Sequence, residues 1–178
     1  MKFEVQDYTN ILPWHPTRMW GQRPLNYIKN IVIHQSACIL TYEQINKMHI
    51  TPGPKNHISP KGCPHIAYHI GIRPNGKVIK MNEYKYITWG AKGHNMHSIH
   101  INVNGNFAGA GWKGQNEPTQ EQLFYLRFLL DYLYKNDFKH LDARDSLKMH
   151  CELDPINRLA DPGYIITELI NKYRVDIK

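Results

Sequence analysis

The stretch "SIHINVNGNF" (residues 98–107) decides the fold class, because apolar and polar side chains alternate along it. Ile99, Ile101 and Val103 fall on one face, and His100, Asn102 and Asn104 fall on the other. Successive side chains of a β-strand point to opposite faces of its sheet, so the pattern predicts a strand with one apolar and one polar face.

Three more strands are predicted upstream of this stretch. The segment "NIVIHQSA" (30–37) contains a short β-branched run ending in His34, as expected of a buried strand. The segments "HIAYHIGI" (65–72) and "KVIKM" (77–81) flank the turn sequence "RPNG" (73–76), which predicts a β-hairpin.

Three helices are predicted to alternate with these strands. Two of them begin with a capping box, in which a threonine is followed three residues later by a glutamine. These boxes are Thr41 with Gln44 and Thr119 with Gln122. The second box opens the longest helix, 119–136, and a last helix is expected over 163–174. Strands interleaved with helices predict an α/β fold with a central mixed β-sheet flanked by about three helices.

Length, composition and charge narrow the possibilities. The chain has 178 residues, 42% hydrophobic and 21% charged, so we expect one domain over 1–178 with the segment 1–29 packed on its core. The net charge of +7 favours a polyanionic partner, which leaves open nucleic acid, a membrane surface or an anionic cell-wall polymer. The basic residues are scattered rather than gathered in one helix or tail, which argues against a dedicated nucleic-acid binder.

The cysteines and the N-terminal sequence give expectations about compartment. Cys38, Cys63 and Cys151 are too few and too far apart for a disulfide framework or a cysteine-only zinc site. One Cys38–Cys63 bridge stays open, although the odd count favours reduced thiols. The N-terminal sequence "MKFEVQDYTNILPWH" (1–15) has no apolar signal-peptide core, and no apolar run approaches the roughly 18 residues of a transmembrane helix. We therefore expect a protein made in the cytoplasm and not inserted into a membrane.

Most of the eleven histidines have no pattern that predicts a metal site. His65 and His69 are four apart, but on the predicted strand they are separated by ~13 Å, too far for two ligands at about 2 Å from one ion. His94, His97 and His100 fail for similar reasons or lie in a loop of unpredicted shape. We interpret these five as hydrated or hydrogen-bonded side chains.

His34 and His150 are different, because His34 ends an apolar strand, where α/β sheets tend to place their sites. His150 lies in "MHCELDPINRLADPG" (149–163), an acidic stretch that contains prolines. Catalytic zinc takes three nitrogen, oxygen or sulfur ligands and keeps a fourth position open. The candidates for the third ligand are Cys151, Glu152, Asp154 and Asp161. Asp161 has a second interpretation, as the N-cap of a helix with proline at its first position.

Six segments, in order, resemble those of a known family. They are "WGQRP" (20–24), "IVIHQSA" (31–37), "HIAYHIGIRPNGKVI" (65–79), "WGAKGHNMHSIHINVNGNF" (89–107), "PTQEQLFYLRFLL" (118–130) and "HCELDPINRLADPG" (150–163). The family is that of the zinc-dependent N-acetylmuramoyl-L-alanine amidases (amidase type 2), shared by phage endolysins, bacterial amidases and peptidoglycan recognition proteins. The resemblance covers about residues 18–170 and implies the fold of the peptidoglycan recognition proteins.

The resemblance implies the metal ligands and a catalytic residue. His34, His150 and Asp161 match the positions that hold one Zn²⁺ per chain. Tyr68 matches a tyrosine that assists catalysis, whereas its place on a strand face with Ile66 would by itself indicate core packing.

Two positions depart from the family's pattern. Active relatives often have a lysine two residues before the metal-binding aspartate, where this chain has Leu159. Arg158 is adjacent, but a guanidinium cannot act as a neutral base. Some bacterial relatives have a glutamate where this chain has Asn102. Glu152, Arg158 and Tyr68 remain the candidates for donating a proton to the leaving amine.

The function implied by the resemblance is hydrolysis, by zinc-activated water, of the amide between N-acetylmuramic acid and L-alanine in bacterial peptidoglycan. Residues expected to bind this substrate are Trp89, Lys92, His94, Asn95 and Asn102. The alternative is a catalytically impaired module that only binds peptidoglycan, which Leu159 favours. A nucleic-acid binder is suggested by charge alone, and we do not expect nucleic acid as a partner.

The setting implied is that of an endolysin, which reaches the cell wall through a separate membrane lesion. A cytosolic amidase that recycles wall fragments would have the same sequence features. We expect a monomer with no separate wall-binding domain.

Overall fold

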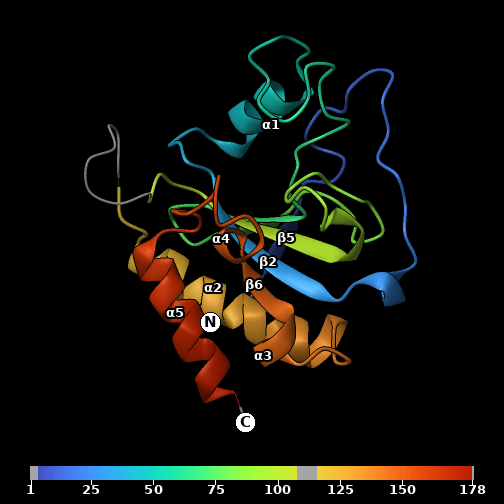
Figure 1. Cartoon of the computed structure of the whole chain (residues 1–178). Helices are drawn as coiled ribbons and strands as arrows, with labels where there is room; N and C mark the ends of the chain where they lie inside the picture. The colour runs from blue at the N-terminus through green and yellow to red at the C-terminus, as the bar shows by residue number, and fades with distance from the viewer. Residues whose placement is uncertain (1–3, 108–115, 178) are drawn as a thin grey trace.

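A six-stranded mixed β-sheet forms the centre of the structure, a computed structural model that describes residues 4–107 and 116–177 (Figure 1). The strands are β1 (Val5–Asp7), β2 (Asn30–Gln35), β3 (Ile70–Ile72), β4 (Val78–Lys80), β5 (Ser98–Val103) and β6 (Leu147–Met149). Their order across the sheet is β1-β4-β3-β5-β2-β6. The β3–β4 pair is the predicted antiparallel hairpin, and the other neighbours run parallel.

Helices cover both faces of this sheet. They are α1 (Tyr42–Ile50), α2 (Gln120–Tyr132), α3 (Ala143–Ser146), α4 (His150–Leu153) and α5 (Tyr164–Asp176). Helix α1 lies over one face, and α2, α3 and α5 lie over the other (Figure 1). The three longest, α1, α2 and α5, are the predicted helices, and both predicted capping boxes are present. The α/β fold with a mixed sheet is thereby confirmed. Within residues 4–107 and 116–177, none of the helices combines the length and the apolar composition of a membrane span.

Strand β5 has the alternation that its sequence predicts. Ile99, Ile101 and Val103 belong to the main hydrophobic core, which also contains buried side chains of α2 and α5. His100 and Asn102 point to the opposite face, yet both are fully buried. The polar face of this strand therefore lies inside the protein, between the sheet and the segments that cover it.

The side chain of Tyr42 attaches helix α1 to this face of the sheet. Its hydroxyl donates to the Asn102 carbonyl oxygen at 2.7 Å and accepts from the Ile72 amide at 3.0 Å, so it bridges β5 and β3. Its ring lies over Gly71, where a Cβ atom would come within 2.5 Å of the ring. Only glycine leaves room for this contact.

The predicted strand over 65–72 is shorter in the structure, because β3 begins only at Ile70. The side-chain amide of Asn82 donates to the carbonyl oxygens of Ile66 and Tyr68, both at 2.7 Å. These carbonyls thus bond a side chain rather than a neighbouring strand. The segment before β3 bends at residues 65, 67 and 69 and is not part of the sheet.

Two helix boundaries also differ from the prediction. Helix α2 ends at Tyr132 and continues as a π-turn over Leu133–Asp137. Helix α5 begins at Tyr164 with Gly163 as its N-cap. The interpretation of Asp161 as a helix N-cap is therefore wrong.

The described part of the N-terminal segment packs against the core. The Trp20 indole donates to Asn82 Oδ1 at 3.1 Å, and Trp14 stacks on His65 with ring centroids 4.4 Å apart. The three cysteines are free thiols, and no Cys38–Cys63 bridge is formed.

Tyr42→Phe is expected to lower the free energy of unfolding by about 1–3 kcal/mol, because it removes a buried hydroxyl that bonds both the Asn102 carbonyl oxygen and the Ile72 amide. Urea denaturation measures this change. Tyr27→Phe, which alters a tyrosine that is 49% exposed, is the matched control and should stay within about 0.5 kcal/mol of the wild type. Equal stabilities for the two variants would contradict the bridging role of Tyr42.

Candidate metal centre

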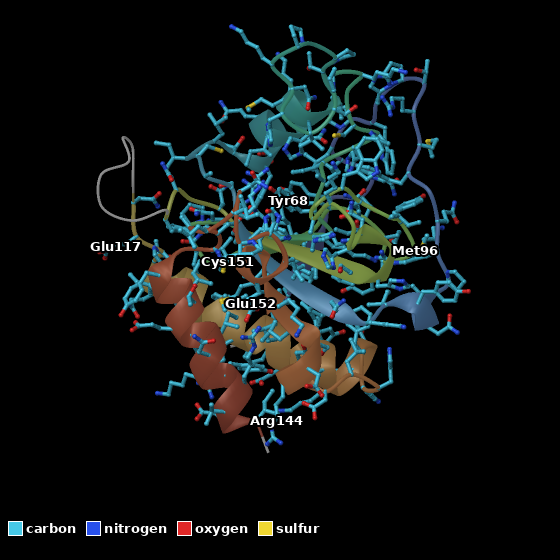
Figure 2. All side chains as sticks on the ribbon, in the orientation of Figure 1. Tyr68, Met96, Glu117, Arg144, Cys151 and Glu152 are labelled. Carbon is cyan, nitrogen blue, oxygen red and sulfur yellow. The ribbon has the colours of Figure 1, made fainter. Side chains whose placement is uncertain are left out.

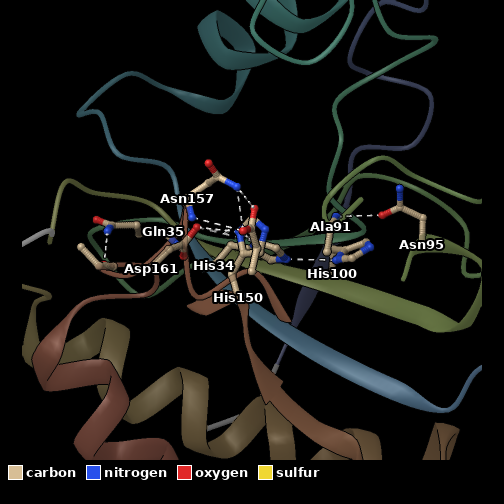
Figure 3. Close-up of polar contacts among 10 residues, drawn as sticks. His34, Gln35, Ala91, Asn95, His100, His150, Asn157 and Asp161 are labelled. Carbon is tan, nitrogen blue, oxygen red and sulfur yellow. Dashed lines mark hydrogen bonds and ion pairs between the residues drawn. The ribbon is translucent and has the colours of Figure 1, made fainter. Parts of the chain in front are cut away.

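Three side chains from distant parts of the sequence converge at one end of the sheet (Figure 3). The Nδ1 atoms of His34 and His150 lie 3.0 Å apart. The Asp161 Oδ2 atom lies 2.8 Å from His150 Nδ1 and 3.9 Å from His34 Nδ1. Within the described ranges, this is the one cluster of three or more histidine, cysteine or acidic side chains that could share an ion.

The two histidines meet because their strands are parallel neighbours. Ile33 of β2 is paired with Met149 of β6, so the next residues, His34 and His150, lie side by side. His34 is near the carboxyl end of β2, and His150 begins α4 directly after β6. Open α/β sheets place their sites at this end of the strands.

Asp161 is brought to the histidines by a closed loop. The Cys151 amide donates to the Asp161 carbonyl oxygen at 2.8 Å, which joins the two ends of the loop. The Gln35 amide donates to Asp161 Oδ1 at 2.8 Å, and the Gln35 side chain donates to the Ala160 carbonyl oxygen at 2.7 Å. With Oδ1 held in this way, Oδ2 faces the two imidazoles.

The spacing of the three donor atoms fits a zinc ion. Imidazole nitrogen and carboxylate oxygen bind zinc at about 2.0–2.2 Å, so tetrahedral ligand atoms lie roughly 3.4 Å from each other. The donor–donor distances of 2.8, 3.0 and 3.9 Å bracket that value. Three protein ligands also leave a fourth position, as catalytic zinc sites require.

The protonation states of the ligands suit a cation. Burial lowers the pKa of His34 and outweighs the opposing effect of the Asp161 carboxylate. For Asp161, burial works against ionisation, but the hydrogen bond with His150 and the nearby His34 ring outweigh it and lower the pKa to about 2. At neutral pH His34 is therefore neutral and Asp161 is ionised, the forms that bind metals.

The other three candidates for the third ligand lie outside this cluster. The Glu152 carboxylate accepts from Arg174 of α5 at 2.6 and 2.9 Å. Asp154 accepts from the Asn157 side chain at 2.9 Å. Cys151 is partly buried and contributes its backbone amide to the loop. Of the four alternatives, the structure brings only Asp161 to the histidines.

Tyr68 lies beside the cluster, on the α1 side of the sheet (Figure 2). Its ring centroid is 5.4 Å from that of His34. Burial raises the pKa of Tyr68, and the Asp161 charge raises it further. The phenol is therefore neutral at neutral pH and has a proton to donate.

A groove of about 530 Å³ opens beside His150. Trp89, Lys92 and Asn95 line it, and these are three of the residues expected to bind substrate. The exposed Arg158 lines it too, close enough for its charge to act on Tyr68 and His34. The groove thus places an aromatic ring and two cationic side chains beside the metal centre.

Two other residues expected to bind substrate are placed elsewhere. Asn102 is fully buried, and its Oδ1 atom lies 3.0 Å from the Tyr42 hydroxyl oxygen. His94 is outside the groove lining, and its carbonyl oxygen accepts from the Ser98 hydroxyl at 2.8 Å. Neither side chain lines the groove beside His150.

Glu152 and Leu159, which bear on the catalytic expectations, both lie away from the three ligands. Glu152, a candidate proton donor, has both oxygens occupied, since Oε2 also accepts from the Met149 amide at 2.7 Å. Leu159 is 79% exposed and is not part of the groove lining. The structure therefore places neither side chain at the metal centre.

Sequence reasoning missed two residues of the site, Gln35 and His100. The Nδ1 atom of His100 lies 3.0 Å from His34 Nε2. His100 pairs with Val32, two residues before His34, so both rings lie on one face of the sheet. The alternation along 98–107 places His100 on the polar face of its strand. Its proximity to His34, however, depends on the register between two strands, which local sequence patterns do not specify.

The comparison with protein families identifies one match. The model of the family described as N-acetylmuramoyl-L-alanine amidase (Amidase_2) matches residues 23–164. This range includes all three ligands of the candidate metal centre. No curated protein sequence matches the chain.

Solved structures share the fold at low sequence identity. The chain is similar to N-acetylmuramoyl-L-alanine amidase LysC from Clostridium intestinale URNW, with 21% identity, a TM-score of 0.66, and 98% and 99% of the two chains covered. It is similar to the Ph2119 endolysin from Thermus scotoductus MAT2119 bacteriophage Ph2119, with 21% identity, a TM-score of 0.69, and 96% and 99% covered. Peptidoglycan recognition protein-LE, solved with tracheal cytotoxin, gives 22% identity, a TM-score of 0.69, and 94% and 92% covered.

His34→Ala and Asp161→Asn are expected to abolish stoichiometric zinc binding, because each removes one of three ligands. Elemental analysis after dialysis against zinc measures this, and the wild type should retain one ion per chain. Asp154→Asn, which alters a carboxylate outside the cluster, is the control and should retain the ion. Retention of one zinc per chain by His34→Ala would refute the site.

Proposed function

The chain belongs to the N-acetylmuramoyl-L-alanine amidase family, and from this membership we propose that it is a zinc-dependent peptidoglycan hydrolase. The bond cleaved is the amide between the lactyl group of N-acetylmuramic acid and L-alanine of the stem peptide. The observation that carries the proposal is the convergence of His34, His150 and Asp161 beside an open groove.

The proposed chemistry is addition of water across this amide bond. When bound by His34, His150 and Asp161, zinc supplies a Lewis acid that polarises the carbonyl group and lowers the pKa of the attacking water. The water oxygen bonds to the carbonyl carbon, the carbon–nitrogen bond breaks, and a water proton goes to the L-alanine nitrogen. The ionised Asp161 is kept in place by the Gln35 amide.

Tyr68 is proposed to stabilise the oxyanion that forms as the carbonyl carbon becomes tetrahedral. The phenol stays protonated at neutral pH because burial raises its pKa, so it can donate a hydrogen bond to that oxygen. A donor of this kind contributes about 3 kcal/mol to transition-state stabilisation when its geometry is good.

The groove residues are proposed to bind the sugar and the peptide. The Trp89 ring gives a flat surface for the apolar face of a sugar, and Asn95 and Lys92 provide polar contacts. A guanidinium cannot serve as a neutral base, so Arg158 is proposed to attract anionic groups of the substrate rather than to transfer protons.

A second candidate function is peptidoglycan binding without hydrolysis. It is favoured by Leu159, an exposed apolar residue where active relatives often have lysine. Binding of peptidoglycan alone does not require two imidazoles and a carboxylate to converge. The metal centre therefore favours the hydrolase.

Digestion of purified peptidoglycan separates these two functions. We expect new L-alanine amino groups without new reducing sugars, and no product after treatment with a chelator. New reducing ends would indicate a glycosidase. Binding without any new amino group would establish the non-hydrolytic module instead.

Tyr68→Phe is expected to lower kcat by about 10²–10³, because it removes the proposed oxyanion donor. Zinc content should not change, since the ring stays in place. Initial rates of amino-group release measure kcat. The control is Tyr164→Phe, which alters a tyrosine 71% exposed on α5 and should leave the rate unaltered. A wild-type rate in Tyr68→Phe would remove Tyr68 from the mechanism.

A further inference from the structure

The second ring nitrogen of His34 contacts another imidazole. While Nδ1 of His34 faces His150 and Asp161, its Nε2 atom lies 3.0 Å from Nδ1 of His100. The two ring centroids are 5.1 Å apart, and both side chains are almost completely buried. His34 is thus held between the candidate metal centre on one side and His100 on the other (Figure 3).

The His100 ring is fixed by its surroundings. A Cβ atom at Gly90 would come within 2.5 Å of the ring, so the backbone of the groove wall rests directly on it. His69 lies on another side, with a ring centroid 5.9 Å away and a nearly parallel plane. The His69 Nδ1 atom also accepts from the His100 backbone amide at 3.0 Å. The position of the His100 Nδ1 atom is therefore determined by packing and by the strand.

The tautomers of the two rings follow from the ligand role of His34. A neutral imidazole that binds a metal through Nδ1 carries its proton on Nε2. His34 then donates from Nε2, and His100 accepts at Nδ1. The proton of His100 is consequently on its own Nε2 atom, which is buried and has no hydrogen-bond partner in the described part of the chain.

This buried donor has a consequence for the role of His100. An unsatisfied buried N–H group is unfavourable, and an apolar side chain of similar size would avoid it. The Nδ1 contact with His34 is the feature that an apolar side chain could not provide.

We propose that His100 is a positioning residue of the metal centre, which orients the His34 ring and fixes its tautomer by accepting the Nε2 hydrogen bond. The inference rests on the proposed function, because it assumes that His34 is a metal ligand. It adds a residue that contacts neither metal nor substrate and acts through His34 alone.

The test compares His100→Leu with His100→Asn. Leucine fills the space but cannot accept a hydrogen bond, whereas the asparagine Oδ1 atom is attached through the same two bonds from Cβ as the imidazole Nδ1. Zinc affinity is measured by competition with a chromophoric chelator. We expect His100→Leu to bind zinc about 10- to 100-fold more weakly than the wild type and His100→Asn to recover most of that loss. The visible spectrum of the cobalt-substituted protein should shift in His100→Leu and return toward the wild type in His100→Asn.

The control is His97→Leu, which removes a histidine bonded to the Tyr27 carbonyl oxygen at 2.8 Å and should leave zinc affinity unchanged. Urea denaturation of the metal-free variants verifies that each is folded. Wild-type affinity in His100→Leu, or equal losses in the leucine and asparagine variants, would overturn the proposal. If affinity follows the expected order but the wild type releases no amino groups from peptidoglycan, the positioning role holds and the proposed hydrolysis fails.

Discussion

The parallel pairing of β2 with β6 is the constraint on which the metal centre depends. His34 and His150 are 116 positions apart in the sequence, and they meet because Ile33 and Met149 are paired in register. A slip of one residue would turn one strand's side chains to the opposite face of the sheet. The third ligand depends on the same pairing, because the amide that holds Asp161 belongs to Gln35, the last residue of β2.

Buried polar side chains attach covering segments to both faces of this sheet. The Asn104 side chain donates to the Leu40 carbonyl oxygen at 2.8 Å, and the Gln122 side chain donates to the Asn104 carbonyl oxygen at 2.8 Å. With the Tyr42 bridge and the Asn82 contacts, these bonds attach covering segments to strand ends by side chains rather than by strand pairing. Preorganised support of this kind lowers the free-energy cost of binding a cation at the ligands that it positions.

Local patterns in the sequence predict much of the fold. The alternation along β5, the hairpin turn and the two capping boxes each depend on residues close together in the chain, and the structure agrees with all of them. The shortened β3 could not be predicted, because it depends on Asn82, a residue beyond the hairpin turn. Within the site, His34 was identifiable from its strand, whereas spacing left four alternatives for the third ligand. Gln35 and His100 were missed because their roles are set by strand register.

At the edge of the groove, Arg158 can provide a charge but cannot also exchange a proton, as a lysine could. A lysine amine can carry charge and, with a lowered pKa, also exchange a proton, whereas a guanidinium stays protonated. The neighbouring residue, Leu159, is exposed and apolar. Together, Arg158 and Leu159 therefore offer a charge to the groove but no exchangeable proton. The Glu152 carboxylate forms an ion pair with Arg174 and is therefore not available as the proton donor. In the proposed hydrolysis, Arg158 and Glu152 therefore do not supply the proton that reaches the leaving amine, and Tyr68 is the one of the three candidates that lies beside the metal centre with a proton to donate.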